Sequence, residues 1–506
     1  MTVARSVRLA RLRRSCLTAL LIASFHQTGV KGAERSNSTK RSSPASLQPS
    51  RITSGMTKGV PLSLADSIFI ALRNNRSIKS AYVERIAQKF ELRVAEDRFT
   101  PKVAVSGTAI RQNVGGIEVT SANVAPNASI LLPTGATLGF AWNNSIVSGS
   151  GVQTQTSTAD INMVQPLLRG GGVDVTLAPL RGARLEDKLN RLNLKKTVSE
   201  TIAQVILAYR ALLQAQEELK LSEAALSRSK DLVEVNRAMI QAGRMASVEI
   251  VQSEADVENQ NIRVLQATKG LDDARLALLV LLSLDLATPA AATESTEPSR
   301  IAPDLPSMMQ IALSERPDYL GQLLIIEQNK LGMTVAENEK LWDLSLFASG
   351  SFGRRNISGP AAIPGVQKIA DTTIGVTFNA PLNDLRREQP AVQATATLQT
   401  SELQLASIRQ GVELQIRSSI NSINIQWKQL EAARRGVGLA TRAVDIEREK
   451  LKVGRSSNVQ VRLLESDLRN AEEQRLAAVV GYLNALTTID LQLGTTLKTW
   501  RINLAD

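Results

Sequence analysis

The sequence has almost no cysteine or histidine. Its single cysteine, Cys16, and its single histidine, His26, both lie within residues 1–32. If that segment is removed, cysteine nucleophiles, histidine bases, disulfide bonds and zinc sites that use these residues are all excluded. The spacing of the remaining carboxylates, serines and lysines does not indicate another mechanism. We therefore expect no catalysis, no metal and no other cofactor.

A long apolar run is also missing. No stretch of eighteen consecutive apolar residues occurs, so we expect no membrane-spanning helix. The apolar segment at 16–25, CLTALLIASF, follows five arginines and precedes Val30-Lys31-Gly32. This order is typical of a secretory signal peptide that is cleaved on export. We predict the signal peptide over residues 1–32.

Beyond residue 60 the chain lacks an excess of charge of either sign. The formal net charge is +12, but residues 1–60 carry eleven Lys and Arg against one acid, Glu34, and the rest carries 49 basic and 47 acidic side chains. This balance gives no electrostatic footprint for nucleic acid, so we exclude that partner. Residues 33–60 are rich in Ser, Pro and basic residues, which predicts a disordered linker.

What the sequence does contain is a twofold internal repeat. Residues 61–283 have the pattern of a helix, alternating strands and a very long helix that turns back, and residues 306–491 repeat that order. Repeats of more than 200 residues are too long for a solenoid. We expect residues 284–305 to form a linker at the waist of the protein and residues 492–506 to form a C-terminal tail.

The two repeats also share short motifs in the same order. Pro166-Leu167 matches Pro381-Leu382 at an offset of 215 residues. Gly243-Arg244 matches Gly454-Arg455 at an offset of 211. Each Gly-Arg pair interrupts a long helical pattern, which predicts a chain reversal at that point. Each proline stands where a strand pattern gives way to a helix, a place where its missing N–H is tolerated.

The long helices carry a strict seven-residue apolar repeat. Its positions are Val205, Leu212, Leu219, Leu226, Val233 and Ile240, and then Ile416, Ile423, Leu430, Val437, Val444 and Leu451. Such a repeat keeps one seam against a neighbour only if the helices coil left-handedly around each other. Shorter helices are predicted at 62–98, 246–282, 306–340 and 457–491. The expected fold class is α+β, mostly α, with long coiled-coil hairpins.

Aromatic residues are scarce as well. Those at Phe140, Trp142, Phe347, Phe352 and Phe378 all lie in segments of alternating polarity, which predict strands. Two to four strands per repeat cannot close a barrel alone, and the unpaired edges of an open sheet promote aggregation. Several copies of an exported chain could close one together in a membrane. We expect these five aromatics at the membrane interfaces, and leave open whether residues 126–146 form an extra hairpin or part of a barrel strand.

The order of helix, strands, QPLLRGGG, long helix and VEIVQSEAD, repeated with APLNDLRR and VQVRLLESD, resembles the TolC-like outer membrane factors over about residues 62–491. The resemblance implies a homotrimer in the outer membrane of a Gram-negative-type bacterium. Four strands per protomer would form a β-barrel in the lipid, above a periplasmic α-barrel. It implies a passive exit duct for an efflux pump or type I secretion system, working with a periplasmic adaptor and an inner-membrane transporter, and no catalysis.

The resemblance also suggests where the adaptor binds. Gly243 and Gly454 become the hairpin tips at the periplasmic entrance, and Arg244 and Arg455 stand where relatives commonly carry an apolar residue. Gln460 stands where some relatives carry a pore-facing Asp, so no Asp ring is expected. The acids close enough in sequence to pair with the two tip arginines are Glu249, Glu254 and Glu465.

A second hypothesis is a periplasmic coiled-coil adaptor or binding protein without a membrane barrel. An adaptor usually has one helical hairpin between β-rich domains, whereas this chain duplicates the hairpin. The duplication and the repeated strand regions favour the duct. Neither hypothesis identifies the cargo, because a passive duct leaves substrate choice to the transporter.

Overall fold

The computed structural model describes residues 60–294 and 297–504. The predicted signal peptide at 1–32, and the predicted linker apart from its last residue, lie outside the described residues. The described part is mostly helical, with strands, and the described residues belong to one compact unit.

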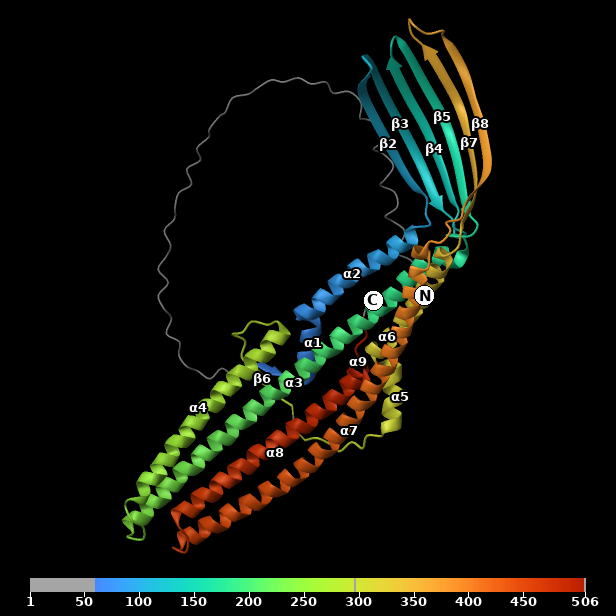
Figure 1. Cartoon of the computed structure of the whole chain (residues 1–506). Helices are drawn as coiled ribbons and strands as arrows, with labels where there is room; N and C mark the ends of the chain where they lie inside the picture. Colours follow the sequence, from blue (N-terminus) through green and yellow to red (C-terminus); the bar gives the residue numbers. More distant parts are fainter. Residues whose placement is uncertain (1–59, 295–296, 505–506) are drawn as a thin grey trace, which may run out of the picture. The chain divides into compact units, whose positions relative to one another are not determined.

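Four long helices form two hairpins (Figure 1). They are α3 (Val173–Gln241), α4 (Glu249–Leu282), α7 (Gln389–Lys452) and α8 (Asn458–Leu493). Helix α3 packs against α4, α7 packs against α8, and α3 also packs against α8. The two hairpins therefore lie side by side, with α3 and α8 in the middle.

The seven-residue seams are confirmed as the packing faces of these hairpins. Val205, Leu212, Ile416 and Leu430 are fully buried, and the other members of both seams are buried or half-buried. A 69-residue helix such as α3 would extend about 100 Å at 1.5 Å per residue. A helix of that length is stabilised by continuous side-chain packing along a neighbour rather than by intrinsic propensity.

Of the four shorter predicted helices, those at 62–98 and 306–340 are each broken into two. They form α1 (Leu64–Asn74), α2 (Arg76–Asp97), α5 (Leu305–Glu315) and α6 (Pro317–Glu339). The Asn75 side chain accepts hydrogen bonds from the backbone N–H groups of Ser77 and Ile78, so it caps α2 and ends α1. Pro317 opens α6 and excludes a helical conformation at the preceding Arg316. Helices α2 and α6 both pack against α3.

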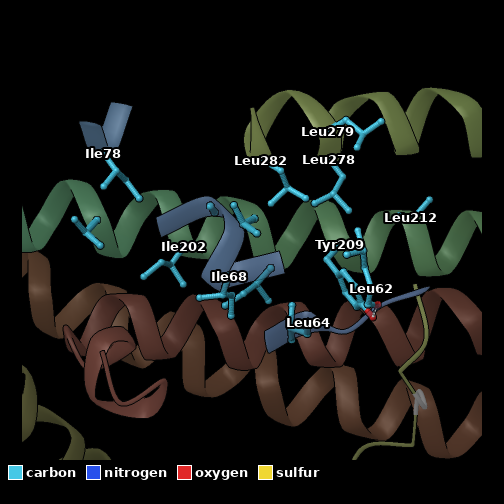
Figure 2. Packing of buried hydrophobic residues seen from close by; sticks show 14 of the residues in the cluster. Leu62, Leu64, Ile68, Ile78, Ile202, Tyr209, Leu212, Leu278, Leu279 and Leu282 are labelled. Atoms are coloured by element: carbon cyan, nitrogen blue, oxygen red, sulfur yellow. Dashed lines mark hydrogen bonds between the residues drawn. The ribbon is translucent and has the colours of Figure 1, made fainter. Parts of the chain in front are cut away.

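A hydrophobic core joins the first repeat to the chain's end (Figure 2). Tyr209 and Leu212 of α3 meet Leu278 and Leu282 of α4 in this core. Strand β1 (Val60–Leu62) pairs in parallel with β6 (Ala290–Ala292) beside it. The Tyr209 hydroxyl donates to the carbonyl of Leu62 at 2.9 Å, which ties this small sheet to α3.

Within residues 60–294 and 297–504, six strands form one antiparallel sheet in the order β2-β3-β4-β5-β7-β8 (Figure 1). They are β2 (Lys102–Val114), β3 (Ile117–Leu131), β4 (Thr137–Gly149), β5 (Val152–Pro166), β7 (Asp343–Ser358) and β8 (Gly365–Asn379). The first repeat contributes four of these strands and the second contributes two. The expected total of four strands per chain is therefore wrong.

The strand that sequence patterning missed is β3, which reads IEVTSANVAPNASIL. Small and polar residues interrupt its alternation, and Pro126 lies where the pairing with β4 skips from Val124 to Asn127. Proline has no N–H to give to the ladder, which explains the local gap. Residues 126–146 thus belong to β3, the turn at 132–136 and β4, inside the same sheet.

Two further elements complete the described chain. The 3₁₀ helix η1 (Leu385–Arg387) precedes α7, and the short helix α9 (Thr496–Thr499) follows α8.

By length and composition alone, α8 could cross a membrane, contrary to our expectation of no such helix. Its packing against α3 and α7 assigns it instead to the paired hairpins.

Candidate functional site

The six-stranded sheet has one strongly apolar face. Residues directly opposite each other on neighbouring strands share a face, as Ala128, Phe140 and Ile161 do. Following this register across all the strands assembles Val103, Val105, Val124, Ile130, Leu138, Trp142, Met163, Leu346, Phe352, Ile374, Val376 and Phe378 on that side. All but Ile130 are large and exposed in the single chain. Such an area of exposed apolar surface indicates contact with lipid or another protein.

The opposite face of the sheet is polar. It carries Ser106, Thr108, Asn123, Asn127, Asn143, Ser145, Thr156, Asp160, Ser349, Asp371, Thr373 and Thr377. Asp160 on this face accepts hydrogen bonds from the side chains of Ser351, at 2.5 Å, and Asn143. A sheet with one apolar and one polar face is suited to separate lipid from water.

The predicted interface aromatics divide between the two faces. Phe140, Trp142, Phe352 and Phe378 lie on the apolar face and are about half exposed. Phe347 lies on the polar face, where its ring covers Gly375 of β8. Phe347 therefore does not share a face with the other four predicted interface aromatics. Trp342, which sequence reasoning missed, packs edge-on against Phe378 with ring centroids 5.8 Å apart.

Both predicted strand-to-helix prolines lie at the junction of sheet and helices. Pro166 is the last residue of β5, and Pro381 lies two residues after Asn379, the last residue of β8. Asp343, at the start of β7, pairs with Arg169 at 3.2 Å and with Arg387 at 2.8 Å. Because these two arginines follow the two prolines, one carboxylate ties together the junctions of both repeats.

The Gly-Arg pairs form matching helix caps at the two hairpin tips. Gly243 and Gly454 have φ of 69° and 73°, the left-handed region that glycine adopts most easily. The backbone N–H of Arg244 donates to the carbonyl of Met239, and that of Gly243 to Ile240. Residues 450–455 repeat both bonds. This is the Schellman motif, which satisfies the last carbonyls of a helix and reverses the chain.

The tip arginines themselves are exposed. Arg244 and Arg455 make no ion pair with any residue in 60–294 or 297–504. The suggested acidic partners are engaged elsewhere or unpaired: Glu254 with Arg237, Glu465 with Arg228 and Arg448, and Glu249 with no cation in those ranges. The expected pairing is therefore wrong. Gln460 is exposed in the first turn of α8.

We expect Gly243→Ala and Gly454→Ala each to destabilise the fold by about 1 kcal/mol, because alanine disfavours the left-handed conformation. Apart from the adjacent residues of the chain, no atom of the described residues lies within 4 Å of the position that a Cβ would take at either glycine, so crowding adds nothing. Thermal unfolding of the purified protein measures the effect. Gly182→Ala, in the open interior of α3, is the matched control and should be neutral or stabilising. Equal midpoints for the tip and control variants would contradict the cap assignment.

Polar residues that sequence reasoning missed join the two hairpins behind the tips. Buried Asn236 of α3 donates to Ser253 of α4 at 2.8 Å and to Asn458 of α8 at 3.0 Å, and Asn458 donates to Ser253 at 2.8 Å. Arg228 of α3 pairs with two acids of α8, Glu465 at 3.1 Å and Glu472 at 3.2 Å. Apart from the bond between Asn236 and Ser253, these contacts join residues more than 200 positions apart.

Further along the same interface, Arg210 of α3 donates to the carbonyl of Leu483 at 2.5 Å and to Thr487 at 2.6 Å. Burial lowers the pKa of its guanidinium to about 10.

Among the described residues, no group of three or more His, Cys, Asp or Glu side chains could hold a metal ion.

Comparisons with known proteins agree with this geometry. Residues 68–283 match the family profile described as outer membrane efflux protein. The chain is 27% identical over 326 residues to the outer membrane efflux protein BepC of Brucella suis. That alignment covers 62% of this chain and 66% of BepC, just under two thirds of its length.

Solved structures share the fold. The CmeC outer membrane channel of Campylobacter jejuni superposes with a TM-score of 0.65 at 16% identity, over 86% of each chain. The MtrE outer membrane channel of Neisseria gonorrhoeae, in its open state, gives 0.64 at 16% identity, over 86% of this chain and 89% of MtrE. The chain is therefore similar to outer membrane efflux proteins over residues 68–283, and it shares the fold of solved outer membrane channels.

Proposed function

We propose that this chain is the outer-membrane exit duct of an efflux pump or type I secretion system. The observation that carries the proposal is the sheet with one apolar and one polar face. In a closed barrel, the apolar face contacts lipid and the polar face lines a water-filled passage. Phe140, Trp142, Phe352 and Phe378 then lie against the bilayer, and Asp160 and Asp371 lie in the lumen.

The sheet has two free edges among the described strands, β2 and β8. Edge strands of this length would promote aggregation unless they are paired. In a homotrimer, β8 of one protomer pairs with β2 of the next and closes the sheet. Three copies of the six-stranded sheet make eighteen strands, in place of the twelve that the resemblance implied. Barrels of 16–18 strands leave an aqueous channel.

Helices α7 and α2 each have a stripe of exposed apolar residues that no other helix in the described part of the protomer covers. Along α7, exposed Val392, Leu403, Leu414 and Ile425 recur every eleven residues, which places them on one side of the helix. On α2, exposed Val83, Ile86, Phe90 and Val94 form a second stripe at helical spacing. A second and third copy of this chain would cover both stripes, because α2 with α4 forms one side of the protomer and α7 the other. This packing would complete the α-barrel.

In this assembly the protein is a passive conduit, not an enzyme. A periplasmic adaptor and an inner-membrane transporter supply cargo and energy, and contact the tips around Gly243, Arg244, Gly454, Arg455 and Gln460. The segments at 1–32, 33–60, 284–305 and 492–506 would serve as cleaved signal peptide, linker, waist and tail. Pro166 and Pro381 would direct each chain from barrel to helix.

Planar-bilayer recording of the protein extracted from outer membranes tests this function. We expect stable conductance steps, because three polar sheet faces enclose water. A protein that leaves the bilayer unperturbed, and that fractionates with soluble periplasmic proteins, would support the adaptor hypothesis instead.

The tip arginines predict the selectivity of the pore. A trimer brings six unpaired arginines to the entrance, and clustered positive charge raises the local concentration of anions. We expect the double variant Arg244→Glu, Arg455→Glu to shift the reversal potential toward cations in a salt gradient. Arg417→Glu, at an exposed site in the middle of α7, is the matched control. An unchanged reversal potential in the double variant would mean that the two arginines are merely solvated.

A further inference from the structure

A partly open cavity of about 430 Å³ lies between the two hairpins, among α3, α4 and α8. Four arginines line it: Arg228 from α3, Arg263 from α4, and Arg462 and Arg469 from α8. The lining also includes the carboxylates of Asp256 and Glu465. The cavity is therefore polar, and cations from both hairpins converge on it.

The acids near the cavity do not balance these arginines. Glu465 is shared between Arg228, at 3.1 Å, and Arg448 behind the cavity, and Glu472 also pairs with Arg228. Asp256 accepts from Ser229 at 2.7 Å and from Gln260 at 3.5 Å. This leaves three arginines of the lining against the single carboxylate of Asp256. They are Arg263, Arg462 and Arg469.

These three arginines have weak or neutral partners. Arg263 makes no ion pair with any residue of the described ranges. Arg462 donates to the backbone and side-chain oxygens of Gln252, at 3.3 and 3.2 Å. Arg469 lies 3.7 Å from Glu473, beyond good hydrogen-bond distance, and donates to Gln260 at 3.4 Å and Ser466 at 3.0 Å. Each therefore has a positive charge that its neighbours do not neutralise well.

Two of these three arginines have a buried donor that makes no hydrogen bond. The Nε atoms of Arg462 and Arg469 are buried and make no hydrogen bond to any described atom. Arg469 is only 7% exposed, so water does not compensate its charge well. Burial and the nearby charge of Arg263 lower the pKa of Arg469. A buried, unsatisfied guanidinium is costly, and an anion in the cavity would remove that cost.

We propose that this cavity binds a small divalent oxyanion, such as phosphate or sulfate. The three arginines carry three positive charges, of which the carboxylate of Asp256 balances one. A divalent anion would balance the other two. Several oxygens can accept from guanidinium groups on α4 and α8 at once, which favours an oxyanion over chloride. Because the ligand contacts both hairpins, its binding holds α4 of the first beside α8 of the second. The inference does not depend on the membrane function.

Isothermal titration of the purified full chain in detergent tests the site, with inorganic phosphate, sulfate and acetate as separate probes. Sodium chloride keeps the ionic strength constant. We expect saturable binding of phosphate and sulfate near one per chain, and at least tenfold weaker binding of acetate. Lack of binding of both divalent anions above the chloride background would overturn the proposal.

The variants assign the binding to this cavity. Arg263 is exposed and unpaired, so Arg263→Gln should fold normally and weaken phosphate binding about tenfold, the loss of one charge-assisted hydrogen bond. Arg462→Gln should weaken it similarly. Arg417→Gln, an exposed site on α7, is the matched control and should bind like the unmodified protein. Unchanged affinity in both cavity variants would refute the site, as would equal weakening in the control.

Discussion

Replacing Asp187 by alanine is expected to destabilise the fold by about 3–5 kcal/mol, the usual cost of breaking a buried ion pair from one side. Asp187 of α3 lies 2.6 Å from Arg85 of α2, and their side chains are 8% and 4% exposed. Arg191, one turn along α3, also contacts this carboxylate at 3.2 Å. The variant therefore removes a buried carboxylate that contacts the guanidinium groups of Arg85 and Arg191.

The effect is measured as the thermal unfolding midpoint of the purified protein in detergent. Asp174→Ala provides the control, since Asp174 forms an exposed pair with Arg181 at 3.0 Å on the same helix. Exposed pairs contribute about 0–1 kcal/mol, so this variant should unfold almost like the unmodified protein. If Asp187→Ala shifts the midpoint no further than Asp174→Ala, the packing of α2 against α3 described above is incorrect.

Ile374→Arg is expected to prevent assembly in the outer membrane, whereas Thr373→Arg next to it is expected to assemble. Ile374 lies on the apolar face of β8 and is 80% exposed in the single chain, while Thr373 lies on the polar face. An arginine that faces lipid near the bilayer midplane costs about 2–4 kcal/mol, and a trimer contains it three times. An arginine that faces the lumen remains in water.

Heat-modifiable mobility of the protein in isolated outer membranes reports assembly of each variant. We expect a strong loss of the folded oligomer for Ile374→Arg. For Thr373→Arg we expect normal amounts of oligomer with altered conductance. If the two variants assembled equally well, or if Thr373→Arg were the defective one, the assignment of the two faces would be wrong.

Much of the helical architecture could be predicted because its signals are local and repeated. The seam from Val205 to Ile240 fits only a helix packed on a neighbour over its whole length. The glycines at 243 and 454 marked the reversals, since a left-handed cap favours a residue without a side chain. The seven-residue seam and the Gly-Arg pair each occur in both repeats, so neither is a chance pattern.

The sheet was harder to predict because register depends on partner strands. Strand β3 has weak alternation and is held by pairing with β2 and β4 on both sides. Phe347 and Phe352 are five residues apart, an odd spacing that places them on opposite faces of a regular strand. Their grouping by residue type alone ignored this spacing.

The polar contacts between the hairpins could not be predicted at all. Arg228 and Glu465 are separated by 237 residues, and only the side-by-side packing of α3 and α8 brings them together. In the sequence, each is one of many charged residues on a long helix. Asn236 is likewise an ordinary polar residue until the fold buries it beside Ser253 and Asn458.

The central claim is that three copies of this chain close one barrel through β2 and β8. Native mass spectrometry of the protein, extracted from outer membranes in mild detergent, tests that claim most directly. We expect a dominant species with three times the mass of the processed chain. A monomer, or a chain recovered only from the soluble periplasmic fraction, would contradict it.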